Sequence, residues 1–494
     1  MNTRQNKVPE NLAEILQDSE FLKFALGNYK TYMMAVIEDR AIPDYRDGMI
    51  PISRRILWSA YDLGIKSTSK PVKSARIVGD VLGRFHPHGD TGTYKAMVGM
   101  TNRNSPFPFI KGDGNWGSMT EPAYAAMRYT EARMGINAET LLFDRFYTPV
   151  LEFVPNFDGA GKEPLILPAI LPVLLLTGKV GIAPGATTMI PSATFKSLIA
   201  FLKATYAMGK LDLMTALKTL RFTSTSGGVE ILPKTPEERE ARKAFFTTIN
   251  GKIRLGSTHT YDDKTATLTF TAFADHWDIS KVIDKVLKIE GVMSATDDTT
   301  KHDKYARLVI KYRRGIRGAQ AQTLTNKIVA ALTTTQHVVL NFTERYVDEK
   351  TGKGEARMKP MSLMKFFSEW IKYRVDLERR ACAYWIGQAS KHIRRLELLM
   401  MACDNLEFLF QLLKSKLDRP AMNARIAKQF KITVEEANII TDMKYYQLSR
   451  LERDALEAQK QKVIKDRAGL AKRRDNPMPY MAQQLDSFAA SCVV

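Results

Sequence analysis

Residues 361–403 restrict the fold more than any other segment, because they contain almost no helix-breaking residue. Apolar residues recur there every three or four positions, as at Leu363, Phe367 and Trp370, which is the spacing of one helix face. At 1.5 Å per residue, such a helix is roughly 60 Å long. That length exceeds a compact domain, so the pattern predicts a second helix packed along the first.

The predicted partner is a helix at residues 448–475. Between the two lies a small helical unit that includes residues 431–445, where Thr433 and Glu436 predict a capping box. Two long helices with a small globule at one end form a spacer. An ordinary helical bundle is the alternative.

The remaining sequence predicts several further domains, because 494 residues are too many for one core. Residues 31–160 carry short helices joined by Gly/Pro turns, after an arm at residues 1–30. Residues 161–360 alternate like half-buried strands at 266–273, 306–312 and 337–347, with helical patterns at 279–289 and 319–332. The sequence therefore predicts an α+β multidomain protein, whose last region, 361–494, includes a globule at about 405–457.

The net charge points to a polyanionic partner. Lys+Arg is 73 and Asp+Glu is 53, so the formal net charge is 73 − 53 = +20. This surplus favours nucleic acid first and an anionic membrane second, with a merely solvated basic surface as the alternative. The longest apolar stretch, 164–178, contains three prolines and is too short to span a membrane. Three scattered cysteines and a polar N-terminus indicate a cytoplasmic protein.

A helix–turn–helix pattern lies in residues 74–103. Residues 74–85 are helical in period, "HPHG" breaks the pattern, and Asp90 is the expected N-cap of a second helix at 91–103. Basic residues in or beside this unit, among them Arg76 and Lys95, favour a DNA-binding role. Two packed helices without such a role are the alternative.

The segment "IKGDGNWGSMT" contains a literal G-x-G-x-x-G at Gly112, Gly114 and Gly117. A dinucleotide fingerprint needs a helix that opens on the last glycine. Pro122 interrupts any such helix. A tight glycine turn that lets two backbone segments approach closely is therefore the favoured interpretation.

Tyr129, beside Arg128 in "AAMRYTEARM", is the best candidate for chemistry. A tyrosine phenol can attack a phosphodiester and keep the phosphate, and an adjacent arginine can stabilise the charge of the transition state. Taken alone, the pair carries no weight, because an amphipathic tyrosine packed at the edge of a helix is the usual case.

Further polar residues could bind phosphate. Four arginines in "RAIPDYRDGMIPISRRILW" are candidate phosphate clamps, with surface salt bridges to Asp44 and Asp47 as the alternative; they are Arg40, Arg46, Arg54 and Arg55. His86 and His88 favour hydrogen bonds to phosphate, or acid–base work, over a metal site. No P-loop and no D-x-D is present, so metal-dependent phosphoryl transfer would need an imported metal.

Four segments resemble, in order, the A subunit of type IIA DNA topoisomerases, the breakage–reunion subunit of gyrase, topoisomerase IV and the phage enzymes. "RAIPDYRDGMIPISRRILW" is similar to R-A-L-P-D-x-R-D-G-L-K-P-x-x-R-R, and "SARIVGDVLGRFHPHGDTGTY" to S-A-R-x-V-G-D-V-x-G-x-Y-H-P-H-G-D. "GDGNWGSMTEPAYAAMRYTEARM" is similar to G-Q-G-N-F-G-S…A-A-M-R-Y-T-E-x-R, and "GKVGIAPGATTMIP" to G-S-S-G-I-A-V-G-M-A-T-x-I-P. Within this family the glycine turn binds no nucleotide.

The resemblance implies roles for individual residues. Tyr129 is the implied nucleophile that forms a 5′-phosphotyrosine, and Arg128 is implied to stabilise the transition state. Ile182 is implied to wedge between base pairs. The other implied DNA-binding residues are Arg40, Arg46, Arg54, Arg55, Arg76, His86, His88, Thr91 and Lys95.

This chain departs from the family pattern at several of these positions. Ile50 replaces a basic residue, Ser53 replaces a histidine, and Lys95 replaces an acid. Two polar groups that face DNA are thereby absent. The change at Lys95, beside Thr91, makes quinolone sensitivity doubtful.

The resemblance also implies an architecture and partners. A winged-helix breakage–reunion domain (31–160), an α/β tower (161–360) and a long antiparallel coiled coil with a small helical exit-gate globule are expected. The chain is expected to bind double-stranded DNA, to dimerise at the DNA gate and the C-gate, and to join a B-type ATPase/Toprim subunit in an A2B2 complex. That subunit is expected to bind Mg²⁺ and ATP, with no metal held by this chain.

The implied activity is that of an ATP-dependent isomerase that acts on DNA in a bacterial or phage-infected cell. Since the sequence has no C-terminal propeller, relaxation and decatenation without strong negative supercoiling are expected. Two alternatives are a tyrosine recombinase and an inactive DNA-bending subunit. A recombinase would form a 3′ rather than a 5′ linkage.

Overall fold

The computed structural model describes residues 20–101, 105, 107–117, 123–274, 278–300, 303, 305–415, 417–443 and 450–491. Most of the predicted N-terminal arm therefore lies outside the described residues. The chain divides into two compact units, Met1–Arg374 with Ala482–Val494, and Val375–Met481. The predicted domain boundaries are finer than this division and stay predictions.

The described part of the first unit begins with a series of helices, of which α3, α4 and α5 contribute to a small core. Helix α3 has a proline in its first turn, where a backbone N–H would have no partner within the helix, so its absence loses no hydrogen bond. Ile56 of α3 and Ile77, Val78 and Val81 of α4 are fully or almost fully buried. The elements are α2 (Glu20–Val36), the π-helix η1 (Ile37–Ala41), α3 (Pro51–Asp62), α4 (Ser74–Arg84) and α5 (Asp90–Val98).

The predicted helix–turn–helix is present as α4 and α5, with two differences at the second helix. Asp90 is the first helical residue, and the N-cap is Gly89, which has no side chain to accept a hydrogen bond. The Asp90 carboxylate instead accepts from the backbone N–H of Thr91 at 2.7 Å, where it also faces the positive end of the helix dipole. The helix ends at Val98, before the predicted residue 103.

A three-stranded antiparallel sheet in the order β1-β3-β2 adjoins these helices. Its strands are β1 (Val72–Lys73), β2 (Ile110–Asp113) and β3 (Glu131–Met134). The tight glycine turn follows β2, with φ of +100° at Gly114 and +75° at Gly117. A Cβ on Gly112 would lie 2.4 Å from Nε1 of Trp116. The tight glycine turn is therefore confirmed, although the group that approaches Gly112 is a side chain rather than a second backbone segment.

The largest sheet has seven strands in the order β6-β7-β16-β11-β10-β9-β8. Its strands are β6 (Lys179–Ala183), β7 (Ala186–Ile190), β8 (Ser192–Ala193), β9 (Phe222–Thr223), β10 (Val229–Glu230), β11 (Asn250–Gly256) and β16 (Thr334–Val339). Helices α8 (Phe195–Met208), α9 (Leu213–Thr219) and α10 (Pro236–Thr247) connect them.

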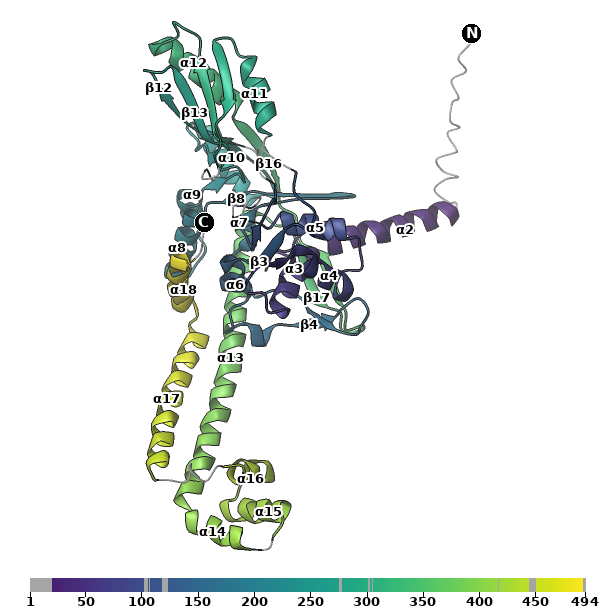
Figure 1. The fold of residues 1–494 in the computed structure, drawn as a ribbon, viewed down its shortest axis with the longest axis vertical. Coiled ribbons are helices and arrows are strands. Elements are labelled where there is room, and N and C mark those ends of the chain that lie inside the picture. The colour runs from purple at the N-terminus through teal and green to yellow at the C-terminus, as the bar shows by residue number, and fades with distance from the viewer. Residues whose placement is uncertain are drawn as a thin grey trace. The chain divides into compact units, whose positions relative to one another are not determined.

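A second, four-stranded sheet packs with two helices, α11 and α12, which Figure 1 shows beside it. Phe270, Leu308, Ile310 and Ile328 belong to the core that these elements share. The elements are β12 (Thr258–Asp262), β13 (Thr267–Ala272), β14 (Val292–Asp297), β15 (Leu308–Tyr312), α11 (Ile279–Leu287) and α12 (Gly318–Ala331). The predicted strands at 266–273 and 306–312 and both helices are confirmed.

The predicted strand at 337–347 is wrong, because the chain changes sheets within it. After Val339 of β16, the backbone N–H of Leu340 bonds to the carbonyl of Ile249 and that of Thr343 to the carbonyl of Pro43. The continuation pairs as β17 (Thr343–Val347) with β18 (Gly354–Met358). The remaining elements are α6 (Ile136–Leu142), η2 (Thr148–Val150), β4 (Phe153–Pro155), β5 (Lys162–Pro164), α7 (Val173–Thr177) and α18 (Met478–Ser491).

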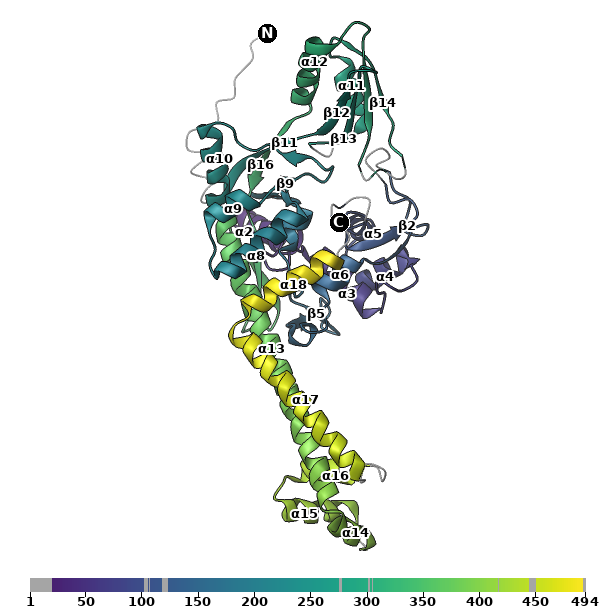
Figure 2. The same ribbon diagram turned by 90° about the vertical axis from the view of Figure 1, so that its left-hand side faces the viewer.

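The predicted pair of long helices is present as α13 (Leu363–Asp404) and α17 (Arg450–Asp475). The second unit contains α17 and the part of α13 that follows Arg374. Figures 1 and 2 show the two side by side. Their direction is antiparallel, since Arg453 pairs with Asp404 at 3.0 Å and Lys460 with Glu397 at 3.1 Å, while Arg473 reaches Glu378. The predicted pairing of these helices is confirmed.

A cluster of three short helices links the long helices: α14 (Leu406–Lys414), α15 (Arg419–Phe430) and α16 (Val434–Thr441). Leu412, Ile426 and Ile440 are buried in its core. The capping box of Thr433 and Glu436 is present at the start of α16, as predicted. Among the helices described, none is long and apolar enough to cross a bilayer.

We expect Gly181→Ala to lower the free energy of unfolding by about 1–3 kcal/mol. A Cβ at this position would lie 2.4 Å from the backbone oxygen of Ala41, which cannot rotate away. Gly79→Ala is the matched control, because nothing lies within 4 Å of a Cβ there and alanine favours the helix by about 0.5–1 kcal/mol. Denaturant unfolding of the two variants would contradict this if Gly181→Ala were as stable as the control.

Candidate nucleic-acid interface and tyrosine loop

Tyr129 lies in a turn just before β3, and its side chain is 65% exposed. Its backbone N–H bonds to the carbonyl of Ala126 at 2.9 Å. The Arg128 guanidinium carbon lies 4.6 Å from the centre of the Tyr129 ring. The phenol is therefore open to a large substrate, with a cation beside it.

The next residue, Thr130, is fully buried and fastens this loop to two helices. Its Oγ1 lies 2.8 Å from Ser74 Oγ at the start of α4 and 2.7 Å from the Tyr94 hydroxyl of α5. The Tyr94 hydroxyl also donates to the carbonyl of Ala125 at 2.9 Å. The backbone N–H of Ser74 bonds to the Thr130 carbonyl at 3.1 Å. The loop is thus held on both sides of an exposed tyrosine.

Tyr94 and Thr130 were not among the predicted site residues. The sequence does place a threonine directly after the candidate tyrosine, and its hydroxyl would need a hydrogen-bond partner if it were buried. The partners of Thr130 lie far away along the chain, however, and the sequence pattern does not identify them.

His86 is a neutral imidazole in this structure. Its Nδ1 lies 3.1 Å from Arg55 Nη1, and a guanidinium can only donate, so Nδ1 accepts and the proton resides on Nε2. Burial lowers the pKa of His86 to about 4, and the nearby charges of Arg55, His88 and Arg40 contribute to this lowering. The His86 and His88 rings stack with centroids 4.3 Å apart. Two bonds of 2.6 and 2.7 Å to Glu163 fix Arg55.

Two of the four predicted phosphate clamps form buried ion pairs. Arg54 is 4% exposed and contacts Asp47 through Nε at 2.6 Å and Nη2 at 3.0 Å. Arg46 makes bonds of 3.0 and 2.8 Å with Asp44. The alternative of salt bridges to these two aspartates is thus present, although the bridges are buried rather than at the surface. Direct contact of either arginine with DNA stays a prediction, and would require a phosphate to displace a bidentate carboxylate.

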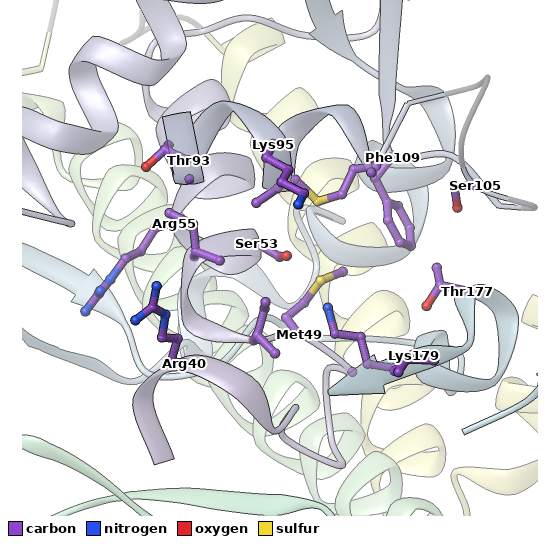
Figure 3. Close-up of a pocket in the computed structure, with 18 of the residues that line it drawn as sticks. Arg40, Met49, Ser53, Arg55, Thr93, Lys95, Ser105, Phe109, Thr177 and Lys179 are labelled. Carbon is purple, nitrogen blue, oxygen red and sulfur yellow. The ribbon is translucent and has the colours of Figure 1, made fainter. Parts of the chain in front are cut away.

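A cavity of about 1320 Å³ gathers cations from several elements. In Figure 3, Arg40, Arg55, Lys95 and Lys179 surround it. Arg345, His86 and His88 also line it. No aspartate or glutamate is found among the described residues of its lining. An opening lined in this way attracts anions.

Ile182 lies on the hairpin of β6 and β7 and is 76% exposed. The hairpin turn places proline before Gly185, whose φ is +76°, as in a type II turn. Gly181 allows the hairpin to approach Ala41 of η1, the element that carries Arg40. An apolar side chain thus projects from a braced hairpin.

The other predicted site residues lie outside the cavity lining. Arg76 is exposed on α4, and Thr91 is exposed at the start of α5. Neither they nor Arg128, Tyr129 and Ile182 line the cavity. Within the part of the chain that the structure describes, no cluster of three or more His, Cys, Asp or Glu residues could hold a metal ion. The source of the metal stays a prediction.

Comparisons with known proteins agree on one family. The family model for the A subunit of DNA gyrase/topoisomerase IV matches residues 40–486. The DNA gyrase A subunit of Campylobacter fetus is 32% identical over 452 residues, which are 89% of this chain and 50% of that protein. The DNA topoisomerase 4 A subunit of Salmonella typhimurium is 31% identical over 465 residues, 92% of this chain and 59% of that protein. For the corresponding topoisomerase 4 protein of Pseudomonas aeruginosa, the values are 31% over 463 residues, 91% and 58%. The chain thus spans half to three-fifths of the length of these relatives.

We expect His86 to make stability depend on pH. Its pKa of about 4 in the folded chain lies below the value of about 6.5 for an unfolded histidine. Above about pH 6.5 this histidine is neutral in both the folded and the unfolded chain, so it does not change the free energy of unfolding. As the pH falls from about 6.5 to about 4, only the unfolded chain takes up the proton, and the folded state loses stability.

The measurement is the melting temperature of the wild type and of His86→Asn across this range. Asparagine keeps an acceptor for Arg55 but does not titrate. The wild type should lose more stability on acidification than the variant, and parallel pH curves for the two proteins would contradict the prediction.

Proposed function

The chain belongs to the family of DNA gyrase and topoisomerase IV A subunits, and from this premise we propose that it is the DNA-breaking and rejoining subunit of a type IIA topoisomerase. The observation that carries the proposal is the exposed Tyr129 beside Arg128, on a loop held by buried hydrogen bonds. An ordinary packed tyrosine would be buried, and it would need no such support.

The proposed reaction is a transesterification. The phenolic oxygen of Tyr129 bonds to a DNA phosphorus as the bond from phosphorus to the 3′ oxygen breaks. The phenolic proton leaves to solvent, and the 3′ oxygen takes up a proton. The DNA end then carries a 5′-phosphotyrosine, and the reverse reaction reseals the strand. Arg128 is placed to stabilise the extra negative charge on the phosphoryl oxygens.

The remaining residues of the site are proposed to hold DNA. Arg40 and His88 contact the backbone near the scissile phosphate, and neutral His86 can donate its Nε2–H to a phosphate oxygen. Arg76, Thr91 and Lys95 contact the duplex from α4 and α5. Exposed Ile182 inserts between base pairs and kinks the duplex. Arg46, Arg54 and Arg55 are proposed to support this surface through their ion pairs, and to reach DNA only if those pairs open.

The proposed complex contains two copies of this chain and two B-type subunits. The copies meet at the DNA gate and at the C-gate, for which the helix cluster α14–α16 is the candidate. Exposed Phe410, Leu413 and Val434 give that cluster apolar contact area. The B-type subunit is proposed to bind ATP and Mg²⁺, and this Mg²⁺ would supply positive charge at the scissile phosphate when bound. Strand passage through the break then relaxes or decatenates DNA.

We expect Tyr129→Phe to abolish DNA cleavage, because phenylalanine lacks the attacking oxygen. The assay mixes the chain with a B-type topoisomerase subunit, Mg²⁺ and supercoiled plasmid, and then traps covalent complexes with detergent. The wild type should yield protein-linked double-strand breaks with short 5′ overhangs. DNA binding by the variant should be unchanged, which a gel-shift measurement checks.

Several outcomes would contradict this proposal. Linkage that survives in Tyr129→Phe would mean that another residue is the nucleophile. A 3′ linkage would indicate recombinase-type chemistry. Binding and bending of DNA by the wild type with each of several B-type subunits, but without any cleavage, would favour a purely DNA-bending subunit.

We expect Thr130→Val to slow cleavage by roughly 10- to 100-fold, since small misplacement of a reacting group has effects of this size. Valine keeps the shape but removes the hydroxyl that joins Ser74 and Tyr94. Tyr94→Phe should act in the same direction. Tyr124→Phe is the matched control, because Tyr124 contacts the Tyr94 ring without joining the hydrogen bonds described here.

Single-turnover cleavage rates and DNA affinity, measured together, test the positioning role. The expected result is a lower rate at unchanged affinity. Equal rates in Thr130→Val, Tyr94→Phe and the control would show that the hydrogen bonds only stabilise the fold.

A further inference from the structure

Several departures from the family pattern line the same cavity. Ile50 and Ser53 stand where the pattern has a basic residue and a histidine, and both line the cavity. Lys95 replaces an acid, and Lys179 occupies the first serine position of G-S-S-G in the fourth motif. Both lysines line the cavity too. The basic groups that the pattern has at positions 50 and 53 are therefore absent here, while Lys95 and Lys179 add positive charge elsewhere in the lining.

The two lysines come from different elements and point into a common space. Lys95 lies on α5, and Lys179 is the first residue of β6. Figure 3 shows both side chains directed into the cavity, where Ser53 and Met49 lie between them. An opening flanked by two ammonium groups suits a phosphodiester, whose single negative charge is shared by two non-bridging oxygens that can each face a cation.

Lys179 has no counterion in the part of the chain that the structure describes. It is half-buried, and burial lowers the pKa of its ammonium group. Lys95 is exposed and likewise has no ion pair with a described residue. By contrast, the neighbouring Arg55 is fixed by Glu163. A desolvated ammonium group without a partner is costly, and an incoming phosphate would remove that cost.

We propose that Lys95 and Lys179 together form a phosphate-binding site for the DNA backbone, one that substitutes for the basic residue and the histidine that the family pattern has at Ile50 and Ser53. The inference rests on the proposed function and names the part of the cavity that holds the phosphate. Since an ammonium next to a phosphate retains its proton, DNA binding at alkaline pH should be accompanied by proton uptake at Lys179.

The experiment measures the affinity of the full chain for a short duplex as a function of salt. Variants are Lys95→Met, Lys179→Met and the double variant, with Lys179→Arg to restore the charge. Lys462→Met is the control, because Lys462 is an exposed lysine of α17 outside the cavity lining. Removal of each phosphate contact should reduce the slope of log affinity against log salt by about 0.9.

The expected result is a smaller slope for each single variant, a further reduction in the double variant, and wild-type slopes for Lys179→Arg and Lys462→Met. Lys179→Met should also melt at the same or a higher temperature than the wild type, because it removes a desolvated charge. A lower melting temperature with an unchanged slope would mean that Lys179 is structural, and would overturn the inference.

The outcomes separate this inference from the proposed function. If the wild type binds and cleaves DNA, but the lysine variants keep its slope, the phosphate site is wrong and the function stands. If the wild type shows no salt-dependent binding to the duplex, both fail together.

Discussion

The buried ion pair of Asp47 and Arg54 holds the surroundings of the cavity in place. Besides Arg54, the Asp47 carboxylate accepts the backbone N–H groups of Met49 at 3.0 Å and Leu167 at 2.9 Å. One side chain thus joins the turn before α3 to a segment 120 residues later. Removing one partner of such a pair costs about 3–5 kcal/mol, because the other charge stays buried. The adjacent Arg55 points elsewhere, to His86 and Glu163, since successive residues of a helix lie about 100° apart.

The cations of this region therefore fall into two classes. Arg46, Arg54 and Arg55 are held by carboxylates, and of these three only Arg55 lines the cavity. Lys95 and Lys179 lack such partners among the described residues, and their charge is available to a ligand. The net charge of +20 does not distinguish these classes, because it counts paired and unpaired cations alike. Pairing within the fold determines which of them are available to an anionic ligand.

Regular patterns in the sequence predicted much of the fold. Periodicity located the helices at α11, α12 and α13, because one face of each must be buried. The long pattern of α13 also predicted a partner helix packed along it. Failures arose where a local pattern met a distant contact. The strand at 337–347 breaks because residues 340 and 343 bond to Ile249 and Pro43. The arginines of residues 40–55 were recognised, but the buried role of Arg46 depends on Arg345, to whose carbonyl it donates, 299 residues away.

The tyrosine loop combines an exposed reactive group with a rigid base. The proposed role requires Tyr129 to reach a substrate as large as a DNA duplex, so burial cannot fix its side chain. The constraint is placed instead on its neighbours, since Thr130 and Ala125 are both tied to Tyr94. This leaves only the side-chain torsions of the tyrosine to be ordered when substrate binds, which is a small entropic cost. Because Tyr94 belongs to α5, which also carries Lys95, the helix proposed to hold the DNA backbone also fixes the loop of the proposed nucleophile. The proposed phosphate contact and the support of the tyrosine loop therefore come from the same helix.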